Sequence, residues 1–375
     1  MSLRHLAPLL ALTLWSGPAQ AAPAPQAPLA VAERLADWQL AHRDDTTLVT
    51  RFSEETRRPA SWQQATFWIG MTMLADHLPA DKHLAKAVLA MGKGEGWHPG
   101  PRPYHADDQA IAQAYLWAAT HGAGAEAVAP TRAHLDHILA QPPKVGLAFY
   151  AGGKGIECET RWCWADALFM APPAWIALSR QTGDARYRRH ALAEYRRTVE
   201  FLYDPAEQLL YRDSRFFERR DEAGRKEFWS RGNGWVFASL ARIIPMLPAG
   251  DPDRTWMEGL FRAMAERLVA LQKADGYWAP SLLATGDTPP ETSGTGFFTY
   301  GLAWGVKAGL LDRAHYAPAA QRGWAALTRA IQPDGRLGYV QQVSDRPEQV
   351  APSDTQYYGT GAFLMAAVAM ADLER

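Results

Sequence analysis

Three carboxylates stand where helices are predicted to begin, and they are the residues best suited to acid and base chemistry. Asp166 lies within the otherwise apolar segment 162–170, and Asp107 and Asp108 form an adjacent pair. Burial would raise the pKa of Asp166, as a general acid near neutral pH requires. The positive end of a helix dipole would lower it, so the direction stays open. Each aspartate could instead only cap a helix, because Asp is a preferred capping residue.

Clusters of polar and aromatic residues precede or open every second predicted helix. They span residues 61–62, 104–108, 161–166, 229–235, 291–296 and 357–361. If the helices alternate in direction, these N-termini meet at one end and create a positive potential with free backbone N–H groups. Such a cleft suits a carboxylate ligand, and tryptophans there suit the faces of sugar rings. The substrate-binding residues that we predict are Trp62, His105, Trp162, Arg212, Arg231, Asn233, Trp235, Thr295 and Tyr358.

Some of these residues also have a purely structural interpretation. The chain has 15 Trp, and any one of them could pack in the core. The glycines of segment 231–235 fit a close backbone approach to a ligand, but equally close packing between helices. Both interpretations are open at this stage.

The elements that must position these residues are helices, since helical periodicity dominates after residue 27 and strand-like alternation is scarce. The predicted helices span 27–45, 62–77, 82–92, 107–121, 130–141, 163–182, 184–203, 231–247, 252–273, 292–310, 315–330 and 360–373. Twelve helices predict six antiparallel hairpins in one domain, residues 22–375. Segments such as 232–244 are poor in charge, whereas intervening ones such as 186–200 are rich in Arg and Glu. This alternation indicates an apolar inner ring within an amphipathic outer ring, with one cleft at its mouth.

Composition excludes several functional classes. Lys and Arg number 39 and Asp and Glu number 40, so we expect no nucleic-acid partner and no membrane-surface partner. The eleven histidines show no zinc-site spacing, and nothing in the sequence requires a metal or another cofactor.

Residues 1–21 are typical of a secretory signal peptide. Arg4 and His5 precede a short apolar segment, and 19–21 fits the small-x-small cleavage rule. A buried N-terminal helix is the alternative. We expect export to the periplasm or the extracellular space after cleavage near Ala21. Cys158 and Cys163 could then form a disulfide, provided that Cys158 lies in a loop before the helix.

Four ordered blocks carry a specific resemblance. They are 164–173, 231–235, 291–295 and 358–364. Together they resemble the signature blocks of glycoside hydrolase family 105, the unsaturated rhamnogalacturonyl hydrolases, which are related to the unsaturated glucuronyl hydrolases of family 88. The resemblance covers residues 30–375 and implies an all-α (α/α)6 barrel of six helical hairpins.

The resemblance also implies a reaction. Family members hydrate the C4=C5 double bond of the terminal unsaturated uronic acid that polysaccharide lyases leave. By block match, Asp166 is the acid/base residue, and either Asp107 or Asp108 is the second catalytic carboxylate. Arg231 and Trp235 match family positions at the substrate. The implied partner is an unsaturated uronyl oligosaccharide from pectic rhamnogalacturonan. The implied reaction removes its terminal uronic acid and needs no cofactor.

One block departs from some family members, which carry a histidine where this chain has 210–215. This departure leaves the sugar beyond the unsaturated residue open. Three other functions remain as alternatives: a conventional inverting glycosidase, a polysaccharide lyase on the same scaffold, and a non-catalytic glycan-binding protein. Neither the oligomeric state nor the choice between the two neighbouring aspartates follows from the sequence.

Overall fold

The computed structural model describes residues 27–45, 49, 53–80, 82–149 and 157–375. The predicted signal peptide therefore lies outside the described residues. Among those described, no helix is both long and apolar enough to cross a membrane.

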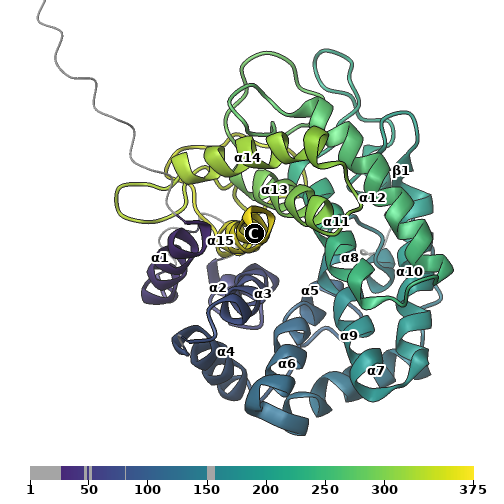
Figure 1. Cartoon of the computed structure of the whole chain (residues 1–375). Coiled ribbons are helices and arrows are strands. Elements are labelled where there is room, and N and C mark those ends of the chain that lie inside the picture. The colour runs from purple at the N-terminus through teal and green to yellow at the C-terminus, as the bar shows by residue number, and fades with distance from the viewer. Residues whose placement is uncertain (1–26, 46–48, 50–52, 81, 150–156) are drawn as a thin grey trace, which may run out of the picture.

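The described helices form two concentric rings (Figure 1). The outer ring contains α1 (Pro28–Ala41), α4 (His83–Gly94), α7 (Ala129–Ala140), α10 (Ala185–Leu202), α12 (Pro252–Leu271) and α14 (Arg313–Arg329). The inner ring contains α3 (Trp62–His77), α5 (Ala106–Gln109) with α6 (Ala112–Ala118), α8 (Ala167–Met170) with α9 (Pro172–Thr182), α11 (Ser230–Ile243), α13 (Thr292–Lys307) and α15 (Tyr357–Glu374). Neighbouring inner helices contact one another, and α15 closes the ring against α3. This confirms the all-α (α/α)6 barrel.

Short elements connect these helices. They are α2 (Ser53–Thr56), the π-helix η2 (Ala119–Ala123), the 3₁₀ helices η3 (Gly124–Ala127), η4 (Glu157–Arg161), η5 (Ser214–Phe216) and η6 (Ile244–Met246), and the strands β1 (Tyr203–Asp204) and β2 (Leu209–Leu210).

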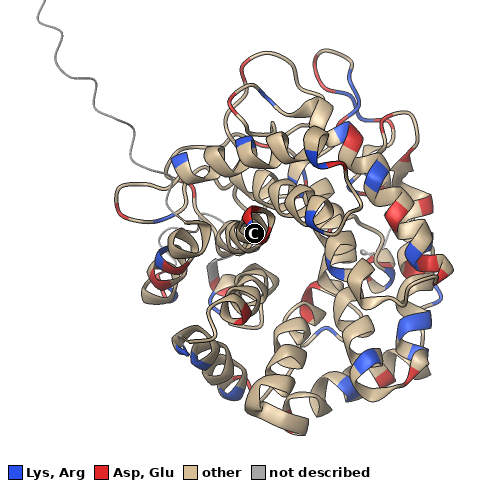
Figure 2. Ribbon diagram, in the orientation of Figure 1, with Lys and Arg blue, Asp and Glu red and all other residues tan. Residues whose placement is uncertain are grey.

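Charge separates the two rings as predicted. Lys, Arg, Asp and Glu lie mostly on the outer helices and loops (Figure 2). On α13, every residue except Trp304 and Lys307 is buried. On α10 the apolar residues fall on one face and the arginines on the other, so that helix can face both the core and water.

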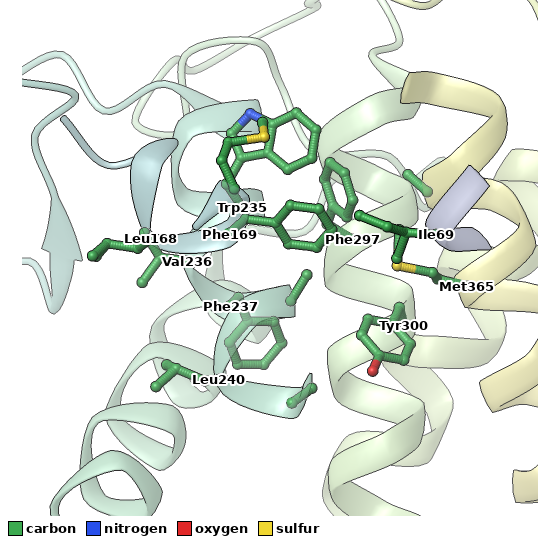
Figure 3. Packing of buried hydrophobic residues seen from close by; sticks show 14 of the residues in the cluster. Ile69, Leu168, Phe169, Trp235, Val236, Phe237, Leu240, Phe297, Tyr300 and Met365 are labelled. Atoms are coloured by element: carbon green, nitrogen blue, oxygen red, sulfur yellow. The ribbon is translucent and has the colours of Figure 1, made fainter. Parts of the chain in front are cut away.

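The side of the inner ring made by α11, α13, α15 and α3 is tightly packed. Phe169, Trp235 and Phe297 meet at its upper end, with Ile69 and Met365 beside them (Figure 3). α15 crosses α3 so closely that a Cβ on Gly361 would lie 2.3 Å from the backbone oxygen of Thr66. Only glycine permits this approach. We call these four helices the packed half.

The other side is interrupted, and here two helices that were predicted as continuous are broken. Segment 163–182 is a loop followed by α8 and α9, and segment 107–121 is α5, a short turn and α6. Pro172 and Pro173 account for the first break, because proline cannot donate the hydrogen bond that would continue α8. We call α5, α6, α8, α9 and the hairpin β1–β2 the cleft half.

The hairpin β1–β2 was missed in the sequence. Its turn is fixed by Asp204, whose Oδ1 accepts hydrogen bonds from the backbone N–H groups of Ala206 (3.0 Å) and Glu207 (3.1 Å). Two-residue strands are too short to show an alternating pattern, although an aspartate opening a turn was visible.

The Cys158–Cys163 disulfide is present, with a Cα–Cα distance of 5.5 Å. Cys158 lies in the 3₁₀ helix η4, which is the loop placement that the bond requires. Trp162, just before the second cysteine, adopts a positive φ of 54°. This left-handed residue turns the backbone, and the turn lies inside the loop that the bond closes.

Candidate active site

A cleft of about 680 Å³ opens at the N-terminal ends of α5 and α8 of the cleft half and of α3 of the packed half. Its lining includes Glu55, Trp62, Arg102, His105, Asp107, Phe149, Glu159, Trp164, Asp166, Met170, Arg212, Arg215, Val343, Ser344, Asp345, Arg346 and Glu348. Its volume suits a small oligosaccharide. Five predicted site residues therefore meet in one cavity: Trp62, His105, Asp107, Asp166 and Arg212.

Asp107 and Asp166 are the two carboxylates of this cleft that the sequence singled out for acid and base chemistry. Burial raises the pKa of Asp107 to about 6; the nearby His105 opposes this rise, and Asp166 adds to it. Burial also raises the pKa of Asp166, against the opposing effect of Arg212. The direction left open in the sequence is thus settled by burial. Two acids whose pKa values are both raised by burial can divide the roles of proton donor and acceptor.

The structure separates Asp107 from Asp108. Asp108 turns away from the cleft and accepts hydrogen bonds from Arg102 Nη2 (2.6 Å) and from the backbone N–H of Arg102 (2.6 Å). Gly100 packs over the Asp108 side chain. Only glycine fits there, because a Cβ would lie 2.5 Å from the Asp108 carboxyl carbon. Asp108 therefore anchors the loop before α5, and Asp107 is the member of the pair that lines the cleft.

Arg212 is brought to the cleft by the hairpin β1–β2. Its Nε lies 3.3 Å from Asp166 Oδ2, and its Nη1 donates to Asp213 at 2.8 Å. Its backbone oxygen accepts a hydrogen bond from Ala165 (2.8 Å), which joins the hairpin to the segment that carries Asp166. Arg212 Nε and Asp166 Oδ2 are buried and make no well-aligned hydrogen bond within the described residues.

Asn233 does not reach the cleft. It is buried, and its side chain pairs with both backbone groups of Leu210, at 2.8 Å and 3.0 Å. Since Leu210 ends β2, Asn233 fixes the strand that leads to Arg212. Asn233, which was predicted to bind the substrate, therefore positions the strand that precedes Arg212.

The outer part of the cleft carries a charged cluster that sequence reasoning missed. Asp213 binds both Arg212 (2.8 Å) and Arg215 (2.7 Å); Arg215 also binds Asp345 (2.8 Å), which in turn binds Arg346 (2.8 Å). Each of these three arginines is thus paired with an aspartate. The guanidinium groups of Arg215 and Arg346 line the cleft, where they can bind the oxygens of an anionic ligand.

Arg231 also lies outside the cleft, contrary to its predicted contact with the substrate. It is fully buried, and it donates to the backbone oxygens of Gln341 (2.8 Å) and Gln342 (3.0 Å). Its guanidinium lies over the rings of Trp229 and Tyr358. Arg231 therefore holds the start of the loop that carries Asp345 and Arg346 to the cleft.

Three further predicted binding residues are buried in the packed half. Trp235 packs against Phe169 and Phe297, which confirms the core alternative for this tryptophan. Thr295 Oγ1 donates to the backbone oxygen of Glu291 at 2.6 Å. Tyr358 donates to Gln341 at 2.6 Å and stacks under Trp62, which is the ring that reaches the cleft.

Trp162 faces a different cavity. It lines a hollow of about 780 Å³ between α7 and α10 with Tyr104, His190 and Phe201. The turn between Cys158 and Cys163 separates this hollow from the cleft. Its Arg161 lines the hollow, and its Glu159 lines the cleft.

The cleft residues that the sequence did not reveal share a cause. Phe149, Arg215 and segment 343–348 lie in loops without a motif, and their approach depends on contacts between distant parts of the chain. Trp164 was visible in a polar-aromatic cluster and could have been selected. No group of three or more metal-ligating side chains occurs in the described part of the chain.

Comparisons with known proteins identify the family of the chain. The model of Glycosyl Hydrolase Family 88 matches residues 31–374. The chain belongs to glycosyl hydrolase family 88. The resemblance inferred from the four sequence blocks is thereby confirmed, and the protein is a glycoside hydrolase.

Individual relatives give more detail. The chain is 42% identical over 350 residues to an unsaturated 3S-rhamnoglycuronyl hydrolase of Alteromonas sp. (strain LOR), covering 91% of this chain and 84% of the relative. A family 88 structure from Bacteroides vulgatus superposes with a TM-score of 0.78 at 26% identity, covering 92% and 98%. A structure called a polysaccharide lyase superposes with a TM-score of 0.77 at 28% identity, covering 92% and 96%.

Proposed function

We propose that this family 88 hydrolase removes the terminal 4,5-unsaturated uronic acid from oligosaccharides that polysaccharide lyases produce, by hydrating the C4=C5 double bond. The observation that supports this reaction is the placement of Asp107, Asp166 and Arg212 in one cleft, with both carboxyl groups titrating above their ordinary range. The relative from Alteromonas, named for an unsaturated glycuronyl substrate, supports the same reaction.

In the proposed reaction, Asp166 donates its proton to C4 while water adds to C5. The carboxylate of Asp166 then takes up the proton that the water releases, so the residue returns to its initial state. The resulting hemiketal at C5 opens, and the hemiacetal left at C1 expels the aglycone as an alcohol. Asp107 beside Asp166 keeps one of the two groups protonated, because two adjacent carboxylates do not ionise together readily.

The arginines have a separate role in this proposal. Arg212, next to Asp166, meets the carboxylate that is conjugated with the double bond, because guanidinium binds carboxylate in a fixed geometry. The stacked pair of Trp62 on Tyr358 presents an aromatic face for a sugar ring.

We further propose that the sugar beyond the uronate is a rhamnose made anionic by a sulfate at position 3, in place of the pectic rhamnose that the sequence blocks implied. The term 3S-rhamnoglycuronyl in the name of the Alteromonas relative, which we take to mean such a 3-sulfated rhamnose, supports this proposal. The cluster of Arg215, Asp345 and Arg346 at the cleft rim supports an anionic group at that position.

The test follows the ultraviolet absorbance of lyase-generated unsaturated disaccharides, since the conjugated double bond absorbs and its hydration removes the signal. We expect absorbance to fall with the wild type and to stay constant with Asp166→Asn. Asp372→Asn, at the opposite end of the barrel beside His77, is the matched control and should retain activity. Parallel assays with 3-sulfated and unmodified rhamnose aglycones identify the preferred substrate.

The same measurement separates the rivals. A lyase would raise the absorbance of a saturated uronate polymer, and the structure called a polysaccharide lyase makes this the leading alternative. An inverting glycosidase would release sugar from saturated substrates without an absorbance change. A glycan-binding protein would give no turnover and would tolerate Asp166→Asn.

We also propose that the chain is exported after cleavage near Ala21. The Cys158–Cys163 disulfide supports an oxidising compartment, where such bonds persist. N-terminal sequencing of protein recovered from the periplasm and the medium of the producing cells tests both the cleavage site and the compartment.

A further inference from the structure

The imidazole of His105 lies between two carboxylates at the wall of the cleft. Its Nε2 is 3.3 Å from Glu159 Oε2, and its Nδ1 is 3.7 Å from Asp107 Oδ2. The ring also packs beside Trp164, with 5.0 Å between ring centres. The side chain of His105 is only 11% exposed and that of Glu159 27% exposed, so both interactions are partly shielded from water.

One further contact fixes the proton on the neutral ring. The backbone N–H of Asp107 donates to His105 Nδ1 at 3.3 Å, and this bond caps the start of α5. Nδ1 must therefore carry a lone pair, which places the hydrogen of the neutral imidazole on Nε2. That hydrogen faces Glu159, so Glu159 stabilises the tautomer in which His105 holds the backbone of Asp107.

The position of Glu159 is in turn determined by the disulfide. Glu159 lies one residue after Cys158 and within the five-residue separation that the Cys158–Cys163 bond closes. On the other side of this short loop, Arg161 binds Glu194 (3.0 Å) and the backbone oxygen of Val145 (2.6 Å). The loop is thus fastened at its ends and on its far side, while Glu159 projects to the cleft.

We propose that Glu159 is a positioning residue for Asp107, acting through His105, and that the Cys158–Cys163 bond holds Glu159 in place for this role. The inference rests on the proposed function, in which Asp107 belongs to the acid/base pair. It adds a residue and a covalent bond to the machinery of that pair.

The charges around His105 give the sign of the effect. Burial lowers the pKa of His105, but Asp107 and Glu159 outweigh it and Arg102 opposes them, so its pKa is raised overall. Without the charge of Glu159, the pKa of His105 falls. The protonated ring, in which Nδ1 carries a hydrogen and no longer accepts the backbone hydrogen bond, is then less populated. Asp107 therefore loses a neighbouring positive charge, while Asp166 and Asp108 still raise its pKa and Arg102 still lowers it. The pKa of Asp107 therefore rises.

The experiment compares Glu159→Gln with Glu157→Gln, an exposed glutamate of the same 3₁₀ helix that does not line the cleft. Histidine proton NMR, with His105→Asn to assign the resonance, gives the pKa of His105. We expect it to fall in Glu159→Gln and to stay unchanged in Glu157→Gln. This readout does not depend on any substrate.

Kinetics with the unsaturated disaccharide supply the second readout. We expect kcat of Glu159→Gln to fall about 10- to 100-fold, as for a misplaced catalytic group, with KM within about twofold. The limb of the pH profile near pH 6 should move to higher pH, and Glu159→Asp should recover part of kcat. The double variant Cys158→Ser/Cys163→Ser should behave like Glu159→Gln.

The outcomes are distinguishable. An unchanged His105 pKa and pH profile in Glu159→Gln would overturn the positioning role. If the His105 pKa falls in Glu159→Gln but the wild type consumes no unsaturated substrate, the positioning contact stands and the proposed function is overturned. A double cysteine variant identical to the wild type would restrict the role to Glu159 and remove the disulfide from it.

Discussion

The packed half and the cleft half of the inner ring use their helix N-termini differently. In the packed half, residues such as Arg231, Thr295 and Tyr358 are buried and bind backbone groups. In the cleft half, Asp107 and Asp166 stand at the start of helices of four residues each, with their side chains in the cleft.

The difference teaches that a distinctive sequence block need not touch the substrate. The blocks of the packed half shape the molecule at the level of helix packing and hold the loop at 341–348. The broken helices of the cleft half give up helical hydrogen bonds, and their carboxylates are buried close to one another. The two aspartates that we propose for the acid/base chemistry lie where the regular architecture is interrupted.

The largest expected effect on turnover comes from a substitution in the cleft half that leaves the ring of helices intact. Asp107→Asn should lower kcat by about 10³-fold, within the range for general acid–base groups. The folded-state pKa of about 6 exceeds the ordinary 3.8, so folding disfavours the charged form and stability is lost as pH rises through this range. The variant should therefore gain up to about 3 kcal/mol at pH 7. Absorbance assays and thermal unfolding measure both.

Asp108→Asn is the matched control for that variant, since it alters the neighbouring carboxylate. It removes the ion pair with Arg102 and should lower the unfolding temperature. Loss of turnover in Asp108→Asn with retention in Asp107→Asn would reverse the assignment of the two residues.

The next effect tests the cation of the cleft half. Arg212→Gln removes the charge beside Asp166, so the pKa of Asp166 rises further and the substrate carboxylate loses its partner. We expect kcat/KM to fall about 10²-fold, in line with the loss of one buried charged contact. Arg219→Gln, which lies outside the cleft lining, serves as the control. Equal kcat/KM values for the two variants would contradict a role for Arg212.

The third prediction concerns the packed half. Gly361→Ala places a Cβ 2.3 Å from the backbone oxygen of Thr66 and should destabilise the fold by about 1–3 kcal/mol, the usual cost of overpacking. Turnover per folded molecule should stay within about twofold of the wild type. Gly94→Ala, at the end of α4 with nothing within 4 Å of the added atom, is the control and should not lose stability. Chemical denaturation measures both variants.

The smallest effect probes the connection between the halves. Tyr358→Phe removes the hydrogen bond to Gln341 (2.6 Å) and should cost about 1 kcal/mol of stability. Because the ring stays under Trp62, KM for the disaccharide should change by less than about twofold. A large rise in KM would show that Tyr358 positions the binding surface as well as the loop.

The sequence predicted the scaffold well because helical periodicity and the charge difference between the rings are local properties. It predicted Asp166 and Trp62 because both stand in clusters at helix starts. It could not choose between Asp107 and Asp108, since the choice depends on how Arg102 and Gly100 fold over one of them.

The residues that were missed required long-range information. Arg215 meets Asp345 across 130 positions of sequence, and no local pattern encodes such a pairing. Arg231 and Trp235 were placed at the substrate because family blocks record what is important without recording why. The burial of a side chain, which only the fold determines, distinguishes a residue that supports the site from one that contacts the substrate.

The closure of the ring by α15 has a consequence for the order in which the protein is made. Helix α15 contacts α1, α3, α13 and α14, and Thr360 binds Gln39 across 321 positions. The apolar surfaces of α1 and α3 that pack against α15 therefore stay uncovered until Tyr357–Glu374 has been synthesised. Asp107 and Asp166 are synthesised long before the helix that closes the inner ring. A nascent chain stalled before Tyr357 would contain Asp107, Asp166 and Arg212 without the helix that closes the ring around them.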